Sequence, residues 1–155
     1  MKLIKKILIA SLLLCLCACN SNTKESANIE YLLQDYDVVK SDGTHPSLMS
    51  DDGPSKEEVK ATFTPEAGQV KFYYYGDTYV GLTSSCKEVT KDGTSMTQCS
   101  VEFTPKPELS WIANVDRYDC ALITHTENYE ILVISLSYNF YGGEQQYHSF
   151  TFTKK

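Results

Sequence analysis

The chain has 155 residues, of which 42% are hydrophobic, 12% aromatic and 22% charged, and its formal net charge is −6. This length fits one ordinary domain and is too short for a barrel enzyme or a two-domain cofactor enzyme. The apolar content excludes a wholly disordered chain. The acidic balance argues against a nucleic-acid partner, because phosphate backbones bind clustered Lys and Arg.

Residues 1–18 have the features of a bacterial export signal. A lysine-rich start precedes a short apolar run, Ile7–Leu16, whereas a membrane-spanning helix needs about 20 apolar residues. The run ends in Leu-Cys-Ala-Cys at residues 16–19. This sequence resembles the bacterial lipobox, Leu-small-small-Cys, in which signal peptidase II cleaves before the cysteine.

The lipobox resemblance implies a lipoprotein in which Cys19 becomes the N-terminus and carries the lipid. Two or three acyl chains anchor a protein firmly, whereas one chain gives marginal binding. Cleavage removes three lysines and lowers the net charge from −6 to −9, so the lipid rather than a basic patch holds the chain at the membrane. Enterobacterial lipoproteins with Asp after the cysteine stay at the inner membrane, so Asn20 favours the outer membrane of the cell envelope.

We expect residues 19–58 to form the lipidated end, a tether and a linker. Apolar residues at 29, 32, 33 and 36 have helical spacing, although residues 36–39 fit an edge strand equally well. The segment 41–58 collects Ser, Asp, Gly and Pro, as loops do. This division places the folded domain at residues 59–155.

Strand signals dominate from residue 59 to the C-terminus. Short alternating segments are separated by turn residues about every ten positions, a pattern typical of a β-sandwich or barrel. The last two strands can pair in two registers. A three-residue loop, 141–143, places Phe150 opposite Ile134, whereas a two-residue loop places it opposite Ser135. Burial of the apolar face favours the three-residue loop.

Two cysteines flank a hairpin signal in this region. Asp92-Gly93 is typical of a type I′ turn, which needs positive φ at both positions. A two-residue loop places Cys86 opposite Cys99 in a non-hydrogen-bonded pair, with Cα atoms about 4.5 Å apart, which suits a disulfide. A three-residue loop, 91–93, would place Cys86 opposite Gln98. We predict the Cys86–Cys99 disulfide.

Three further features support a family resemblance. Pro-Glu-Ala-Gly lies between two strand segments within residues 63–72, Ser-Trp-Ile follows at 110–112, and Asn128 precedes the closing hairpin. The pattern resembles the BACON domain, a module common in lipoproteins of gut anaerobes, although no Arg follows Asn128. The resemblance covers about residues 59–155. It implies an all-β, immunoglobulin-like β-sandwich of seven to eight strands and a role associated with carbohydrate.

The remaining reactive side chains form no recognisable catalytic or metal constellation. The three histidines are scattered, without the close spacing of metal ligands. Cys120 is left without a partner, and we expect a buried free thiol there, with an intermolecular disulfide as the alternative. We therefore predict a protein that is not an enzyme and has no cofactor or metal.

The eleven tyrosines give the one indication of a binding surface. In a strand, Phe72 and Tyr74 share one face while Tyr73 and Tyr75 share the other. Exposed tyrosines suit sugar rings or protein partners. The alternative is that Tyr is present because it has a high propensity for strands and covers a solvated sheet face. Together with Tyr141 near the closing turn, Tyr73 and Tyr75 are the candidate ligand-binding residues.

These observations predict a lipid-anchored envelope module that binds a glycan or an envelope protein without catalysis. The alternative is a structural or assembly subunit of an envelope protein complex. The arrangement of the exposed tyrosines distinguishes the binding module from the assembly subunit. A glycan platform needs two or three coplanar rings near polar donors. An assembly face needs a broader apolar patch.

The lipobox generates a direct prediction. Cys19→Ala should leave the precursor uncleaved and abolish its partitioning into the detergent phase, because no other thiol stands at the position where the lipid is attached. Phase separation with Triton X-114 and labelling with a lipid precursor measure both effects. Unchanged lipid labelling of the variant would refute the assignment.

Overall fold

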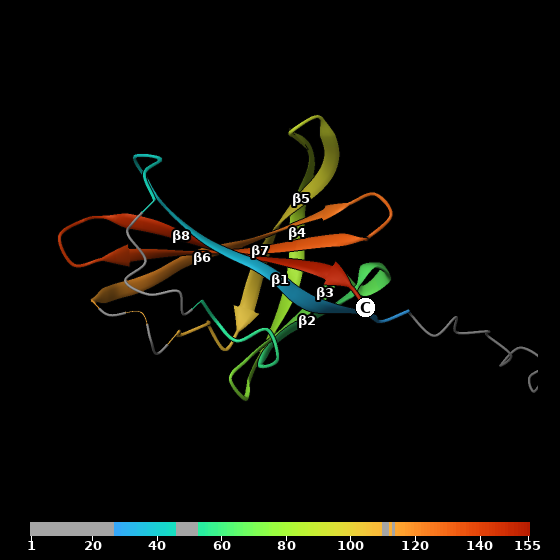
Figure 1. Cartoon of the computed structure of the whole chain (residues 1–155), viewed down its shortest axis with the longest axis horizontal. Coiled ribbons are helices and arrows are strands. Elements are labelled where there is room, and N and C mark those ends of the chain that lie inside the picture. The colour runs from blue at the N-terminus through green and yellow to red at the C-terminus, as the bar shows by residue number, and fades with distance from the viewer. Residues whose placement is uncertain (1–26, 46–52, 110–111, 113) are drawn as a thin grey trace, which may run out of the picture.

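The structure of the chain, a computed structural model, describes residues 27–45, 53–109, 112 and 114–155. The predicted signal peptide, Cys19 and Trp111 lie outside these ranges. The described residues contain eight β-strands and a short 3-10 helix (Figure 1). The elements are β1 (Ile29–Lys40), β2 (Val59–Thr64), η1 (Pro65–Ala67), β3 (Gln69–Tyr74), β4 (Asp77–Lys91), β5 (Thr94–Thr104), β6 (Val115–Thr126), β7 (Ile131–Phe140) and β8 (Gln145–Lys154).

The strands form a closed up-and-down barrel. Each strand pairs antiparallel with the next along the chain, and β8 pairs with β1, from Tyr31–Lys154 to Lys40–Gln146. The expectation of an immunoglobulin-like sandwich is therefore wrong, although the all-β composition and the strand number are correct. A sandwich of two sheets leaves edge strands. In this chain β1 hydrogen-bonds to both β2 and β8, so neither β2 nor β8 is an edge strand.

The corrected topology depends on β1, which lies in the segment predicted to be a tether and linker. Of the two alternatives for residues 36–39, a helix or an edge strand, the strand is correct. Its inward side chains include Tyr31 and Leu33 before a β-bulge at Gln34, and Tyr36 and Val38 after it. The extra residue at a bulge breaks period-two alternation. The resulting three-residue step from Leu33 to Tyr36 imitates helical spacing. The folded domain therefore begins at β1 rather than at residue 59.

The closing hairpin has the register that burial favoured. Ile134 lies opposite Phe150, and both side chains have no exposed surface. The loop contains three residues, and Gly143 has a φ of +84°, a conformation that suits glycine. The prediction of a three-residue loop is confirmed.

The cysteine hairpin is also confirmed. Lys91 pairs with Thr94 around the two-residue Asp92–Gly93 loop, in which both residues have positive φ. The Cys86 and Cys99 sulfur atoms are joined in a disulfide with a Cα–Cα distance of 4.0 Å. A bulge lies next to this bridge, where the register of β4 against β5 shifts between Ser84 and Lys87.

Cys120 is a free thiol, as predicted, but it is exposed rather than buried. Its neighbour Ala121 is buried, as is Ile123 two residues further along β6. Because alternate side chains of a strand point to opposite faces, inward placement of Ala121 and Ile123 turns Cys120 outward.

Aromatic rings fill much of the barrel interior. Phe72 is fully buried, and its ring centroid lies 5.0 Å from that of Phe150 and 6.5 Å from that of Phe103. An eight-stranded barrel is just wide enough for side chains to fill its interior. The interior is therefore a packed core rather than an open channel.

Gly81 of β4 lies where the core has no room for a side chain. A Cβ atom there would lie 2.4 Å from Cγ1 of Val101 and 2.9 Å from Cδ1 of Phe103. We expect Gly81→Ala to lower the free energy of unfolding by about 1–3 kcal/mol through overpacking, measured by urea denaturation. Val101→Ala removes the nearest methyl group, so the double variant should lose less than the sum of the single losses. Strict additivity would contradict this account.

Candidate functional site

The three tyrosines proposed from the sequence lie at separate places. Tyr73 is half-buried on the outer face of β3, where it lines a hollow of about 330 Å³. Tyr75 follows β3, is 48% exposed, and its hydroxyl accepts a hydrogen bond from the backbone nitrogen of Ser55 at 2.9 Å. Tyr141 lies in the β7–β8 turn and is 71% exposed.

These positions do not form one aromatic platform. The β3–β4 and β7–β8 turns lie at the same end of the barrel but four strands apart in an eight-stranded ring, on opposite sides of the rim. The described ring contact of Tyr75 is with Tyr74, at a centroid distance of 4.8 Å. The structure therefore does not bring Tyr73, Tyr75 and Tyr141 together.

A larger hollow lies on the outer surface, between the β4–β5 hairpin and the neighbouring strands. We call it the hairpin groove; its volume is about 620 Å³. Figure 1 shows the hairpin projecting beyond the strands beside it. The groove is lined by Asp35, Asp37, Val39, Val89, Thr90, Lys91, Asp92, Thr94, Met96, Gln98, Thr124, Thr126, Ile131, Val133, Ser135, Ser149 and Thr151.

The floor of the groove is the outer face of β6, β7 and β8. In the cross-strand register, Thr124, Val133 and Thr151 stand side by side in one row. Ser135 and Ser149 form the next row, and their hydroxyl oxygens lie 3.0 Å apart. Hydroxyl and apolar groups therefore alternate on the floor, which can make both hydrogen bonds and apolar contacts.

One wall of the groove is acidic. Asp35 and Asp37 lie on the outer face of β1, and both are exposed. Oδ1 of Asp35 accepts a hydrogen bond from the backbone nitrogen of Tyr36 at 2.9 Å, and Oδ1 of Asp37 lies 3.0 Å from Nδ1 of His45. Each carboxylate keeps surface that a ligand can reach.

The hairpin forms the other wall, and the disulfide ties its base. Val89 lies opposite Met96, and both side chains line the groove. The Cys86–Cys99 bridge joins the two strands beside the bulge, where Ser85 has a φ of +48°. This cross-link restricts how far the two strands can separate next to the groove.

A second hollow, of about 530 Å³, lies at the end of the barrel beside the β5–β6 connection. Its lining includes Lys106, Arg117, Tyr118 and Tyr138. The Tyr138 hydroxyl donates a hydrogen bond to the carbonyl oxygen of Pro107 at 3.0 Å. Burial raises the pKa of both tyrosines, so both hydroxyls are protonated at neutral pH.

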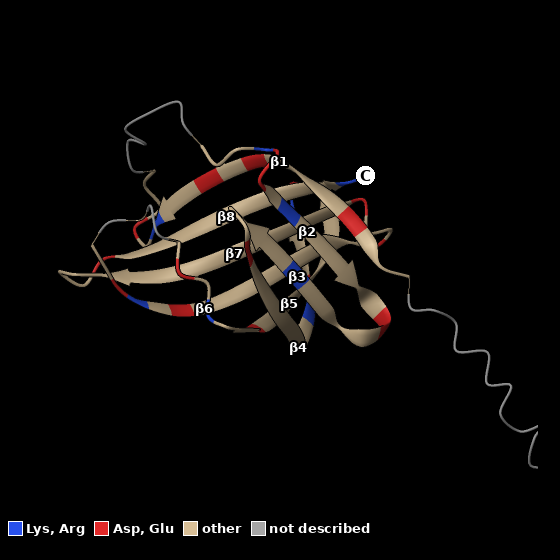
Figure 2. Cartoon of the chain, turned by 90° about the horizontal axis from the view of Figure 1, so that it is seen from below, with Lys and Arg blue, Asp and Glu red and all other residues tan. Residues whose placement is uncertain are grey.

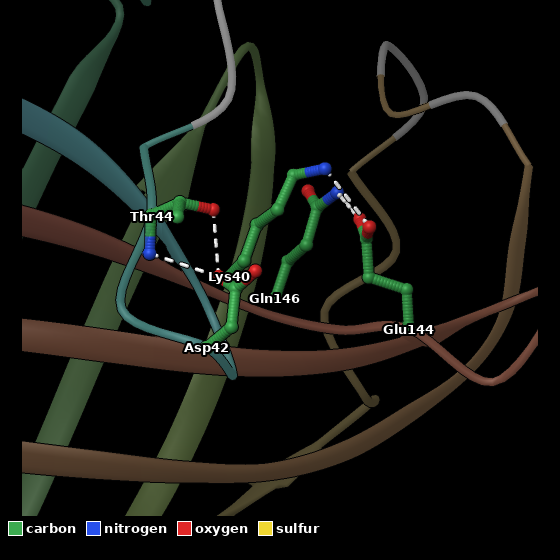
Figure 3. A network of polar contacts seen from close by, with 5 residues as sticks. All are labelled: Lys40, Asp42, Thr44, Glu144 and Gln146. Atoms are coloured by element: carbon green, nitrogen blue, oxygen red, sulfur yellow. Dashed lines mark hydrogen bonds and ion pairs between the residues drawn. The ribbon is translucent and has the colours of Figure 1, made fainter.

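A polar network links the end of β1 to the start of β8 at the same end of the barrel (Figure 3). Nζ of Lys40 lies 2.9 Å from Oε2 of Glu144, and the side-chain amide of Gln146 donates to the other carboxylate oxygen. Hydrogen bonds from Gln146 and Lys40 lower the pKa of Glu144. The bond to Glu144 raises the pKa of Lys40. The network supports the β1–β8 pairing.

His148 of β8 points into the barrel. Its Nδ1 lies 2.5 Å from the hydroxyl of Tyr36, and its ring meets that of Tyr138 edge-on at a centroid distance of 5.4 Å. Burial lowers the pKa of His148 to about 4 and raises that of Tyr36. Both side chains are therefore uncharged at neutral pH.

Sequence reasoning missed the groove for two reasons. Asp35 and Asp37 lie in the segment predicted to be a tether, and the other groove residues come from β1 and β4–β8. One usable signal was present: Asp35 and Asp37 alternate with Tyr36 and Val38, which is the pattern of a strand with one polar face. The hairpin wall follows from the Asp-Gly turn, but its position over the floor does not.

Comparisons with known proteins gave no match: no family model, no curated protein and no solved structure matches the chain. In the described part of the chain, no cluster of His, Cys, Asp or Glu side chains could hold a metal ion. Within the same ranges, no helix is long and apolar enough to cross a membrane.

The buried His148 generates a pH prediction. Its pKa is about 4 in the barrel and about 6.5 in an unfolded chain. The unfolded state therefore binds an extra proton between these values, and stability falls as the pH drops below 6.5. The contribution of His148 amounts to a loss of about 2 kcal/mol between pH 7 and pH 5.

We expect His148→Phe to abolish this part of the pH dependence, measured as the difference between urea unfolding free energies at pH 7 and pH 5. His45→Gln, at an exposed position, is the control and should retain the loss. A His148→Phe chain that loses as much stability as the wild type would contradict the assignment.

Proposed function

We propose that the chain is a lipid-anchored binding module of the bacterial envelope, and that its ligand occupies the hairpin groove. The observation that supports this proposal is the groove itself. Its volume of about 620 Å³ falls within the range of about 300–1,000 Å³ that is usual for ligand sites. Its lining combines apolar contacts with hydrogen-bonding groups.

The location follows from the sequence. The lipobox-like Leu-Cys-Ala-Cys at residues 16–19 supports lipid attachment at Cys19, and Asn20 favours the outer membrane. In this proposal the lipid holds the barrel at the membrane and leaves its outer surface free to bind. The acidic net charge supports a lipid anchor over direct adsorption to an anionic membrane.

The chemistry of the groove favours a protein ligand over a glycan. Among the described residues, its lining contains no aromatic side chain, whereas tyrosine rings are the reason to expect sugar binding. The exposed Tyr75 and Tyr141 stand on opposite sides of the rim, so they cannot supply two adjacent rings. The proposed activity is binding, because the groove offers apolar surface, hydroxyls and carboxylates, which suit contacts with a ligand.

The proposal predicts that blocking the groove abolishes binding. Val133→Arg places a long cation in the middle of the floor and should weaken binding by at least about tenfold. The measurement is binding of the full-length lipoprotein, in neutral detergent, to arrays of peptides and glycans.

Thr62→Arg makes a comparable change on the outer face of β2, outside the groove lining, and is the matched control. Thermal unfolding confirms that both variants are folded. If both variants bind as tightly as the wild type, the ligand lies elsewhere. If both variants lose binding, the effect is a general one of charge.

A further inference from the structure

We propose that the hairpin groove binds an extended, basic polypeptide segment. This inference rests on the proposed function, because it takes the groove to be the binding site and specifies what occupies it. It is carried by the distribution of charge around the groove, the spacing of the carboxylates on β1 and the composition of the floor.

The groove has an excess of negative charge. Three of its lining residues are aspartates and one is a lysine. Lys91 and Asp92 are neighbours at the hairpin tip and offset each other, so the excess comes from Asp35 and Asp37. Figure 2 shows acidic bands on β1, whereas basic bands lie on β2 and β3. A complementary ligand therefore carries positive charge where it meets β1.

The spacing of the two carboxylates fits an extended chain. Asp35 and Asp37 are two residues apart on one strand, so their side chains are about 7 Å apart. Alternate side chains of an extended peptide have the same spacing. Two basic side chains on one face of such a peptide can therefore meet both carboxylates at once.

The floor suits the remaining parts of such a peptide. Val133 and Ile131 offer apolar surface, while Thr124, Thr151 and Ser149 offer hydroxyls. A bound backbone must find partners for its N–H and C=O groups, and these hydroxyls can both donate and accept. The floor can thus contact the peptide backbone while the β1 wall selects its charge.

Other occupants fit less well. Nucleic acids and anionic lipids carry the same sign of charge as the β1 wall. A second copy of this chain has a net charge of −6 before cleavage of the signal and −9 after it, so self-association through an acidic groove is opposed by repulsion. A neutral glycan brings no positive charge to Asp35 or Asp37.

The test uses three fluorescein-labelled ten-residue peptides that differ at alternate positions, which are all Lys, all Gln or all Glu. The other positions hold Val and Ser. Fluorescence anisotropy with the full-length lipoprotein in neutral detergent measures their binding. We expect the Lys peptide to bind about 5- to 30-fold more tightly than the Gln peptide, since each exposed ion pair contributes modestly. The Glu peptide should bind least.

Two double variants identify the charges responsible. Asp35→Asn/Asp37→Asn should reduce binding of the Lys peptide to the level of the Gln peptide and leave the Gln peptide unchanged. Glu57→Gln/Glu58→Gln removes the same charge from exposed positions outside the groove lining, and should preserve the preference. Raising NaCl from 50 to 500 mM should weaken the binding of the Lys peptide but not that of the Gln peptide, because salt screens exposed charges.

Each outcome has a defined meaning. If both double variants lower Lys-peptide binding equally, the attraction is non-specific and the inference is wrong. If the Gln or Glu peptide, or a glycan, binds as tightly as the Lys peptide and Val133→Arg removes that binding, the inference is wrong while the proposed function stands. If no peptide or glycan binds, or if Val133→Arg has no effect on what binds, both are wrong.

Discussion

The pairing of β1 with both β2 and β8 is the interaction on which the rest of the structure depends. It runs from Tyr31–Lys154 to Lys40–Gln146 on the β8 side and from Ile29–Phe63 to Leu32–Lys60 on the β2 side. Without β1, β2 and β8 would become edge strands with unpaired backbone groups, which favour aggregation. The same strand also places the acidic wall of the groove, so closure of the barrel and the chemistry of its surface come from one segment.

Local chemistry made the hairpins predictable, and long-range pairing made the closure unpredictable. The Asp92–Gly93 turn and the burial of Phe150 opposite Ile134 each depend on residues close in sequence, and both registers are as expected. For β1 the sequence left a helix and an edge strand open, because the bulge at Gln34 gives part of the strand the spacing of a helix. The groove combines segments more than 100 residues apart, and no local pattern reports such proximity. Alternation did predict which tyrosines turn outward, but not that the rim would separate them.

The filled interior explains why the proposed site lies outside the barrel. An eight-stranded barrel either packs its interior with side chains or holds one small ligand. Here Phe72, Phe150 and Phe152 are fully buried and in ring contact, so the core serves stability. The outer face then provides the binding surface, and the disulfide-tied hairpin provides its wall. A wall restrained before binding lowers the ordering cost of association. The proposed lipid at Cys19 adds a location at the membrane without using that surface.

Amide hydrogen exchange of β1 tests the central claim of a barrel closed by this strand most directly. In a closed barrel the hydrogen-bonded amides of β1 exchange only through cooperative opening, as slowly as those of β7 and β8. The account predicts comparable protection for Leu33 or Val38 and for Ile134, measured by NMR or mass spectrometry at neutral pH. Exchange of the whole 29–40 segment at the rate of an unstructured peptide, with residues 59–155 still protected, would contradict the closed barrel and restore a tether in front of a smaller domain.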